Sequence, residues 1–424
     1  MPQAGIIFVR PRTYSWLHVV SSARSVFPVP PAHTSRVAQL LAHGQPVKIV
    51  CFGDSITGAY YHPGGRRAWS DALGSALRSH YPNNPIALIN AGISGNTTTD
   101  GLQRMEHDVL AHRPDLIVAM FGMNDVVRVE ATVFRTNLET LIARARAHQA
   151  EVVLMTPNAV FPDDPARPPE KLAAYAQHMR EVALANQVAL ADCHQAFEYI
   201  RVNDGTAWPR LMSDPVHPNM RGHRVFAQVV AKTITGKTTE LPELPVHAVP
   251  LPRLLAKSGT AGPMRIVAMC PLDTLISSAL RRLFPALALQ IIPWATAGKS
   301  ILDLEQDAMR IGWTRYREQP GLPEPDMFVV TIPPGDRGVG REQFYRSWAM
   351  ILNRAQSFGE LRWDCLPILP SVTIPDPGPD QHALEQLALC GVLDKDLPAI
   401  VRSKDETGSP LELLTAKLAT LLGA

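Results

Sequence analysis

The sequence predicts an α/β protein with a central parallel sheet between two layers of helices. Residues 48–52, 86–90 and 115–121 are short apolar runs, and the last shows no alternation of polar and apolar residues. Runs of this kind are typical of buried parallel strands. Segments with helical patterns separate them, and this alternation favours a sheet that is covered by helices on both faces.

The helices are predicted from the positions of proline and glycine and from the spacing of apolar residues. A helix at about 34–43 leads into the first strand, and the next is expected after the Gly64-Gly65 loop, from about Arg66. A third, at about 99–112, follows the second strand. A fourth, at about 220–232, carries apolar residues on one side and can therefore pack against the sheet.

A serine follows the first predicted strand at its carboxyl end. Gly53 allows the backbone to turn sharply after the strand, and Asp54 and Ser55 come next. Ligands bind at this edge of open α/β sheets, so Ser55 is a candidate nucleophile. The alternative is an ordinary strand-to-loop turn, because glycine, aspartate and serine all favour turns.

An aspartate and a histidine stand three residues apart near the end of the first half. Pro215 and Pro218 stiffen the segment that carries Asp214 and His217. At this spacing the carboxylate can reach Nδ1 of the imidazole and leave Nε2 free to face a serine. Because so short a motif often occurs by chance, a surface turn is the alternative.

Donors for an oxyanion are expected at the same edge of the sheet. Asn124 follows the third strand, and its amide can donate to a negatively charged oxygen. The backbone amides of Gly95 and Ser55 are the other candidates, since Gly95 has no side chain to prevent close approach. Taken singly, Asn124 and Gly95 are also ordinary turn residues.

These segments resemble the blocks of the SGNH (GDSL-type) hydrolases, in the family's order across residues 47–233. The similar segments are Gly53-Asp54-Ser55, Ser94-Gly95-Asn96-Thr97, Gly122-Met123-Asn124-Asp125 and Asp214-Pro215-Val216-His217-Pro218-Asn219. One departure is Met123, which stands where glycine is frequent. The resemblance implies a flavodoxin-like three-layer fold and a catalytic set of Ser55, Asp214, His217, Gly95 and Asn124.

The resemblance also implies a serine esterase that forms an acyl-enzyme. In that mechanism His217 deprotonates Ser55, Asp214 orients His217, and Gly95 and Asn124 stabilise the oxyanion. We expect no cofactor and no metal. A zinc site at His194, beside Asp192 and Cys193, is not favoured, because no second close-spaced ligand pair exists.

Composition limits the other classes of function. The formal net charge of +2 gives no electrostatic case for nucleic acid or an anionic membrane as partner. The five scattered cysteines show neither a disulfide framework nor metal-binding spacing. The sequence contains no stretch with the apolar length of a membrane span, and residues 1–22 lack the continuous apolar region of a secretory signal. We therefore expect a cytoplasmic protein and leave open a homo-oligomer.

The length of 424 residues suggests two domains. We predict an irregular arm at 1–34, a catalytic domain at 35–235, a proline-rich linker at 236–263 and a second α/β domain at 264–424. Residues 265–269, 297–300 and 324–330 parallel 48–52, 94–97 and 113–119, which indicates a duplicated domain. Leu272 and Gly335 stand where Ser55 and Asn124 would be, so the copy is expected to be inactive. Generic strand–helix alternation is the alternative.

Polar and aromatic residues near the motifs suggest the substrate. The candidates for substrate binding are Asp54, Tyr60, Arg66, Asn96, Asp125 and Trp208. Such a lining suits a sugar or another hydroxylated alcohol better than a long acyl chain. We therefore expect a short-acyl esterase acting on a small-molecule or carbohydrate ester, with a carbohydrate O-acetylesterase as the narrower hypothesis. The alternatives are a lipase or thioesterase of the same family, or a non-catalytic binding protein on an esterase-like fold.

Overall fold

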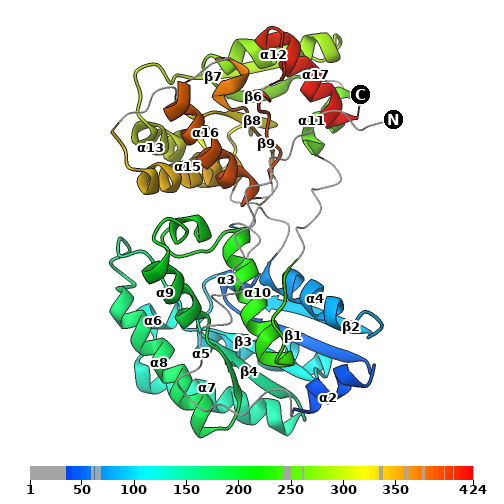
Figure 1. Cartoon of the computed structure of the whole chain (residues 1–424), viewed down its shortest axis with the longest axis vertical. Helices are drawn as coiled ribbons and strands as arrows, with labels where there is room; N and C mark the ends of the chain where they lie inside the picture. Colours follow the sequence, from blue (N-terminus) through cyan, green and yellow to red (C-terminus); the bar gives the residue numbers. More distant parts are fainter. Residues whose placement is uncertain are drawn as a thin grey trace. The chain divides into compact units, whose positions relative to one another are not determined.

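The computed structural model describes residues 35–58, 62, 68–241, 250–259, 262–333, 338–357, 360, 362–374, 378–395, 397–403 and 405–423. Among them, residues 35–58 and 68–241 form a first compact unit, and residues 62 and 250–423 belong to a second. Each unit contains its own parallel sheet (Figure 1). The predicted arm at 1–34 lies outside the described residues.

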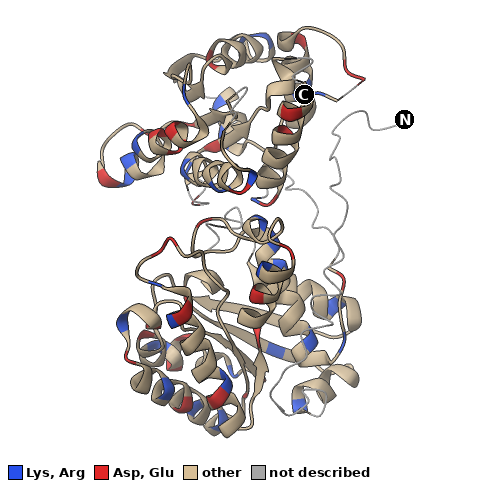
Figure 2. Cartoon of the chain, turned by 60° about the vertical axis from the view of Figure 1, so that its left-hand side comes forward, with Lys and Arg blue, Asp and Glu red and all other residues tan. Residues whose placement is uncertain are grey.

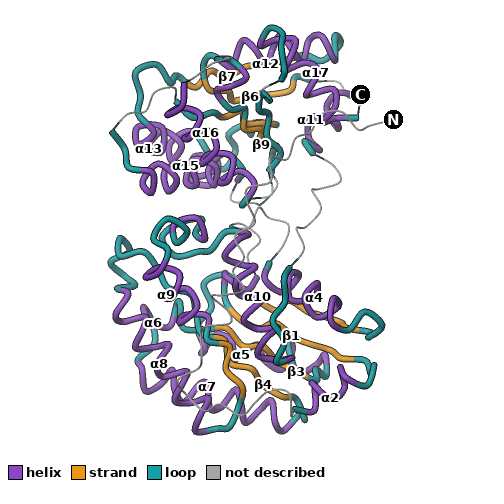
Figure 3. Tube along the Cα trace, in the orientation of Figure 1, coloured by secondary structure: helices purple, strands orange, loops and turns teal. Residues whose placement is uncertain are grey.

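The first unit is built on a five-stranded sheet in the order β2-β1-β3-β4-β5, with every pairing parallel. Helices α4 and α10 pack together on one face of this sheet, and α5, α7 and α8 cover the other (Figure 3). Its strands are β1 (Val47–Gly53), β2 (Ile86–Gly92), β3 (Leu116–Met120), β4 (Glu151–Met155) and β5 (Ala189–Ala191). Its helices are α2 (Arg36–Ala42), α3 (Ser55–Gly58), α4 (Trp69–His80), α5 (Thr98–Asp108), η2 (Leu110–His112), α6 (Asp125–Arg128), α7 (Ala131–Ala147), α8 (Pro169–Ala185), α9 (Cys193–Asn203), η3 (Pro209–Leu211) and α10 (Met220–Thr235).

The predicted α/β fold is confirmed, with one local difference after the first strand. The sequence predicts the next helix from about Arg66, whereas the one-turn helix α3 begins at Ser55. Asp54 closes this turn, because its carbonyl accepts from the amides of Thr57 and Gly58 and its Oδ1 accepts from the amide of Ile56 at 2.9 Å. The longer helix α4 begins at Trp69.

The second unit contains a four-stranded parallel sheet in the order β7-β6-β8-β9. When the strands of each unit are counted in chain order, both sheets have the order second, first, third, fourth, and the first unit adds β5 at the end. The strands of the second unit are β6 (Met264–Met269), β7 (Leu289–Trp294), β8 (Met327–Val330) and β9 (Asp364–Pro367). Its helices are α11 (Pro252–Ser258), α12 (Leu272–Leu283), α13 (Ile301–Ile311), α14 (Trp313–Glu318), α15 (Arg341–Ala355), η5 (Pro370–Val372), α16 (Gly378–Leu393) and α17 (Pro410–Leu422).

Equivalent carboxylates fasten the strands of the two sheets. In the first unit, Asp115 accepts from the amide of Lys48 at 2.9 Å and donates its own amide to the Lys48 carbonyl. In the second, Asp326 makes the same two bonds with Arg265, both of 2.8 Å. Identical bonding at positions paired by the sequence comparison supports duplication over chance alternation of strands and helices.

The helix that precedes each sheet is also held in the same way. Glu151, at the start of β4, accepts from the amides at the amino end of α2 at 2.6 and 3.1 Å. Asp364, at the start of β9, accepts from the first amides of α11 at 3.1 and 2.8 Å. Helix α11 lies within the stretch for which the sequence predicts a linker. It joins the second unit because Leu251 and Leu254 are buried in the core of that unit.

The positions that correspond to the predicted site differ in the second unit. Leu272, which aligns with Ser55, is buried at the start of α12. Gly335, which aligns with Asn124, lies outside the described residues. Lysine and arginine are interspersed with aspartate and glutamate over both units (Figure 2). None of the described helices has the length and apolar character needed to span a membrane.

Candidate active site

Ser55 occupies a tight turn at the carboxyl end of β1. Gly53 and Gly58 make this tight turn possible. Helix α3 approaches β2 so closely that a Cβ at Gly58 would lie 2.0 Å from the Gly92 carbonyl oxygen. Gly53 is confined too, since a Cβ there would lie 2.5 Å from the Met120 carbonyl oxygen. The glycines therefore let the serine stand at the sheet edge with its helix packed directly on the neighbouring strand.

The loop that carries Asp214 and His217 is fixed by backbone bonds. The amides of Val216 and His217 donate to Asp214 Oδ1 at 2.8 and 2.7 Å. These bonds fix the Asp214 carboxylate against the backbone of its own loop. Asn158, in the loop after β4, donates to the Val216 carbonyl at 2.9 Å. Asn219 then caps α10 by accepting from two of the helix's first amides. The aspartate and the histidine thus sit on a short, cross-braced segment.

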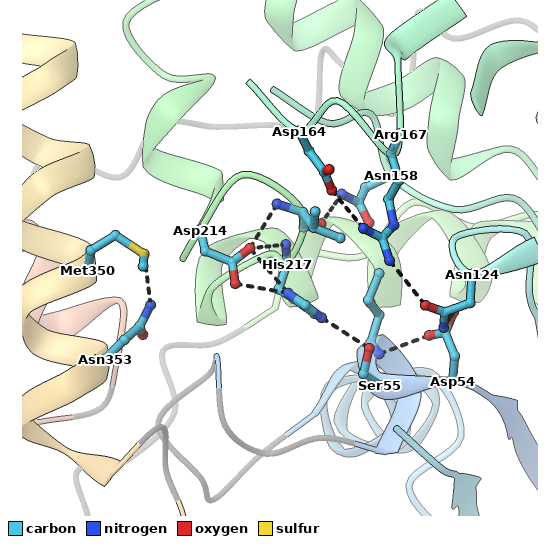
Figure 4. A network of polar contacts seen from close by, with 12 residues as sticks. Asp54, Ser55, Asn124, Asn158, Asp164, Arg167, Asp214, His217, Met350 and Asn353 are labelled. Carbon is cyan, nitrogen blue, oxygen red and sulfur yellow. Dashed lines mark hydrogen bonds and ion pairs between the residues drawn. The ribbon is translucent and has the colours of Figure 1, made fainter. Parts of the chain in front are cut away.

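Asp214, His217 and Ser55 form one hydrogen-bonded chain (Figure 4). His217 Nδ1 lies 2.9 Å from Asp214 Oδ2 and 3.1 Å from Oδ1, and His217 Nε2 lies 3.0 Å from Ser55 Oγ. With Nδ1 protonated toward the carboxylate, Nε2 is the acceptor that faces the serine. Burial lowers the pKa of His217, but attraction to the Asp214 carboxylate outweighs it, and the net shift is upward.

Asn124 lies on the other side of Ser55 from His217 in the same view (Figure 4). Its Nδ2 donates to the Asn96 carbonyl at 3.0 Å and makes a long contact of 3.5 Å with Asp54 Oδ2. Gly95 adopts a left-handed conformation with φ of 79°, and apart from Gly95 and its two chain neighbours no described atom lies within 4 Å of the place that a Cβ would take. Among the described residues, the amides of Ser55 and Gly95 have no acceptor. These donors are available to a ligand at the sheet edge.

Two of the carboxylates proposed for substrate binding are buried. Burial raises the pKa of Asp54 to about 7. Asp125 is fully buried, where it accepts from the amide and hydroxyl of Thr98 and from the amide of Gly122. Burial also raises the pKa of Asp125. Asp125 therefore braces the loop that presents Asn124 rather than facing solvent.

The other predicted substrate-binding residues fall into three groups. Tyr60 and Arg66 lie outside the described residues. Trp208 is only 5% exposed and packs edge-on against Phe161 and Phe197, so it belongs to the core of the first unit. Asn96 remains at the edge of the site. Its backbone carbonyl accepts a hydrogen bond from the Asn124 side chain, and its own side chain is supported by a second hydrogen bond.

That support comes from Arg104 on α5, which the sequence analysis did not single out. Its guanidinium donates to Asn96 Oδ1 at 2.6 Å, to the Ala91 carbonyl at 2.8 Å and to the Gly53 carbonyl at 2.9 Å. It also lies 4.6 Å from the centroid of the Phe52 ring, a favourable cation–π geometry. Arg104 lies on the face of α5 whose residues Gly101 and Met105 are buried. A charged side chain on a buried face needs hydrogen-bond partners, and this position is the signal that the sequence offers for Arg104.

The cluster around His194 serves the structure of the first unit. Asp192 caps α9 by accepting from the Gln195 amide and is paired with Arg180 at 2.7 and 3.0 Å. The amide of His194 donates to the Thr156 hydroxyl, and burial lowers the pKa of its imidazole. These contacts hold the Asp192-Cys193-His194 segment at the start of α9.

Residues 51–225 match the GDSL-like lipase/acylhydrolase family. An acetylxylan esterase from Geobacillus stearothermophilus is 29% identical in an alignment of 214 residues that covers 45% of this chain and 95% of that protein. An arylesterase from Vibrio mimicus is 34% identical over 26% of this chain and 53% of its own length. An isoamyl acetate-hydrolyzing esterase from Saccharomyces cerevisiae is 23% identical over 44% of this chain and 85% of its own length.

Solved structures of similar proteins cover a similar share of the chain. Axe2, an acetylxylan esterase from Geobacillus stearothermophilus, is 27% identical, with a TM-score of 0.39, over 44% of this chain and 94% of that one. LAE5, an α/β hydrolase from the metagenome of Lake Arreo, is 27% identical, with a TM-score of 0.38, over 45% and 96%.

The parallel sheet covered by helices defines an α/β fold, with Ser55 at the carboxyl edge of that sheet. Residues 51–225 belong to the SGNH (GDSL-type) hydrolase family, and the chain is a carboxylic ester hydrolase.

Replacing Arg104 with methionine should destabilise the first unit and lower activity together. The Gly53 and Ala91 carbonyls and the Asn96 amide would lose their shared donor, and each buried polar group left without a partner costs about 1–3 kcal/mol. We expect the free energy of unfolding of this unit to fall by about 2–4 kcal/mol in urea titrations. Arg144→Met is the matched control, since Arg144 bonds to one carbonyl from a more exposed position. Equal losses in both variants would contradict a special role for Arg104.

Proposed function

We propose that the first unit hydrolyses short-acyl esters through Ser55, with His217 as general base and Asp214 as the group that orients it. The observation that carries this proposal is the continuous hydrogen-bonded chain from Asp214 through His217 to Ser55. A serine is a weak nucleophile at neutral pH unless an adjacent base takes its proton, and this chain provides such a base.

The proposed reaction uses these contacts. His217 Nε2 takes the proton of Ser55 as Oγ bonds to the acyl carbon, and the carbonyl oxygen becomes an oxyanion. The amides of Ser55 and Gly95 and the side chain of Asn124 donate to that oxygen. As the tetrahedral adduct collapses, His217 returns the proton to the departing alcohol. Water then attacks the acyl-enzyme with His217 again as base, which releases the acid and restores the serine.

Acetyl esters are the substrates we favour. Two relatives from different organisms, the acetylxylan esterase and the isoamyl acetate-hydrolyzing esterase, are both named for acetate esters, although their alcohols differ. The larger aligned share of the acetylxylan esterase, 95% of its length, supports an acetylated carbohydrate as the alcohol side of the substrate.

Ser55→Ala should abolish turnover of 4-nitrophenyl acetate without unfolding the protein. Loss of the nucleophile in such a triad lowers kcat by thousands-fold or more, so less than about a hundredth of the wild-type kcat should remain. Labelling by a serine-directed fluorophosphonate should disappear as well. Ser75→Ala, which removes an α4 hydroxyl that donates to the Asp71 carbonyl, should leave both readouts unchanged. A Ser55→Ala variant with substantial activity would exclude the proposed nucleophile.

Acyl length provides a separate test of the substrate. With 4-nitrophenyl acetate, butyrate and octanoate, kcat/KM should be highest for acetate, and acetylated xylo-oligosaccharides should release acetate measurable by an enzyme-coupled assay. Each added methylene typically changes discrimination in a fitted pocket by about tenfold or more. A preference for octanoate that still depends on Ser55 would replace the acetyl assignment with a lipase-like one.

The pH dependence should report His217. Because the pKa of His217 is raised above its ordinary value, the acid limb of kcat/KM should titrate above about 6.5. In Asp214→Asn the attraction that raises this pKa is removed, so the limb should move to lower pH while kcat falls by about 10³–10⁴-fold. Glu198→Gln, which changes an exposed pair with Arg201, should not move the limb. An unshifted limb in Asp214→Asn would mean that another group controls it.

A further inference from the structure

Arg167 reaches the proposed oxyanion site from a loop outside the family blocks. It lies between β4 and α8, directly before Pro168. Its guanidinium contacts three residues, and Figure 4 shows the contacts with Asp164 and Asn124. Nε donates to the Met123 carbonyl at 2.9 Å, Nη2 to Asn124 Oδ1 at 3.3 Å, and Nη1 to Asp164 Oδ2 at 2.6 Å. The arginine and aspartate side chains are only 21% and 17% exposed, so the pair is largely shielded from water.

The contact with Oδ1 determines which end of the Asn124 amide faces the reaction. A side-chain amide has an accepting oxygen and a donating nitrogen, and the two ends can exchange by rotation. A guanidinium only donates, so it accepts the oxygen end as partner and disfavours the nitrogen end. Nδ2 is thereby turned toward the Asn96 carbonyl and Asp54.

One hydrogen of Nδ2 remains weakly engaged in this orientation. The first is used in the 3.0 Å bond to Asn96, whereas the second meets Asp54 Oδ2 only at 3.5 Å. This second hydrogen is the one that an oxyanion can take. With the amide rotated, the Oδ1 lone pairs would meet the developing negative charge instead, which would raise the barrier.

We propose that Arg167 is a positioning residue for the oxyanion hole, holding the Asn124 side chain so that its NH2 group faces the reacting carbonyl. This inference rests on the proposed function of Ser55 and Asn124. Asp164 supports the arginine through its ion pair, and the bond to the Met123 carbonyl fixes the loop from which Asn124 projects.

A double-mutant cycle on 4-nitrophenyl acetate tests this coupling. Asn124→Ala should lower kcat by about 10²–10³-fold, as expected for loss of one oxyanion donor. Arg167→Ala should lower kcat by about 10–100-fold with KM changed by less than about threefold, because the interaction is realised mainly in the transition state. Since both act through one amide, the double variant should be within about threefold of Asn124→Ala alone.

Two further variants separate positioning from charge and from stability. Arg167→Lys keeps the positive charge but lacks the planar fork that holds Met123 and Asn124 together, so it should recover only part of the lost kcat. It also takes the place of Arg167→Ala in the cycle if the alanine variant does not fold. Arg180→Ala is the matched control, because Arg180 is a similarly covered arginine in an ion pair with Asp192. It should lower thermal stability but leave kcat within about twofold.

The outcomes distinguish this inference from the proposed function. Multiplicative losses in the double variant would show that Arg167 acts independently of Asn124 and would overturn the proposal. A raised KM with unchanged kcat in Arg167→Ala would also overturn it and assign Arg167 to substrate binding. If Ser55→Ala is inactive while Arg167→Ala keeps the wild-type kcat, only the role of Arg167 fails. If Ser55→Ala stays active, the proposed function itself fails.

Discussion

The guanidinium of Arg104 is the contact on which the geometry of the candidate site depends. It donates to the Gly53 carbonyl beside the turn that carries Ser55, to the Ala91 carbonyl near the end of β2, and to the Asn96 side chain in the loop that contains Gly95. The three segments belong to the carboxyl ends of the neighbouring strands β1 and β2 and to the loop after β2, and their three oxygen atoms lie around the Arg104 guanidinium. A single side chain with several donors in a fixed fork can satisfy them together, which a lysine could not do.

The second unit shows how the same backbone is stabilised without that arginine. Its equivalent of Arg104 is Asp307, which pairs with Lys299, the equivalent of Asn96. The Cys270 carbonyl, equivalent to that of Gly53, accepts instead from the Thr296 hydroxyl at 2.6 Å. The capping box of α5 is retained in α13, and Gly298 keeps a left-handed φ of 72°. The two units thus share this local backbone conformation, but the charged side chains around it differ, and Leu272 stands at the position of Ser55.

The surroundings of the two buried histidines, His217 and His223, favour different protonation states. The Asp214 carboxylate stabilises protonated His217, whereas the neighbouring His223 is kept neutral, because burial lowers its pKa to about 3. His223 Nδ1 instead accepts from the Trp69 amide at 2.9 Å at the start of α4. The two buried imidazoles therefore have different functions: one is paired with a carboxylate and faces Ser55, and the other caps a helix.

The sequence by itself determined where the first three strands lie along the chain and which residues follow their carboxyl ends. The positions of Ser55 after β1 and Asn124 after β3, and the Asp214–His217 spacing, follow from turn chemistry and short-range periodicity, which operate within a few residues. Tertiary structure alone decided what the long side chains reach: Arg104 and Arg167 bond to segments 8–51 and 43–44 residues away. It also buried Trp208, which the sequence had suggested for substrate binding. Such partners depend on how distant elements pack, and neither composition nor spacing along the chain records that packing.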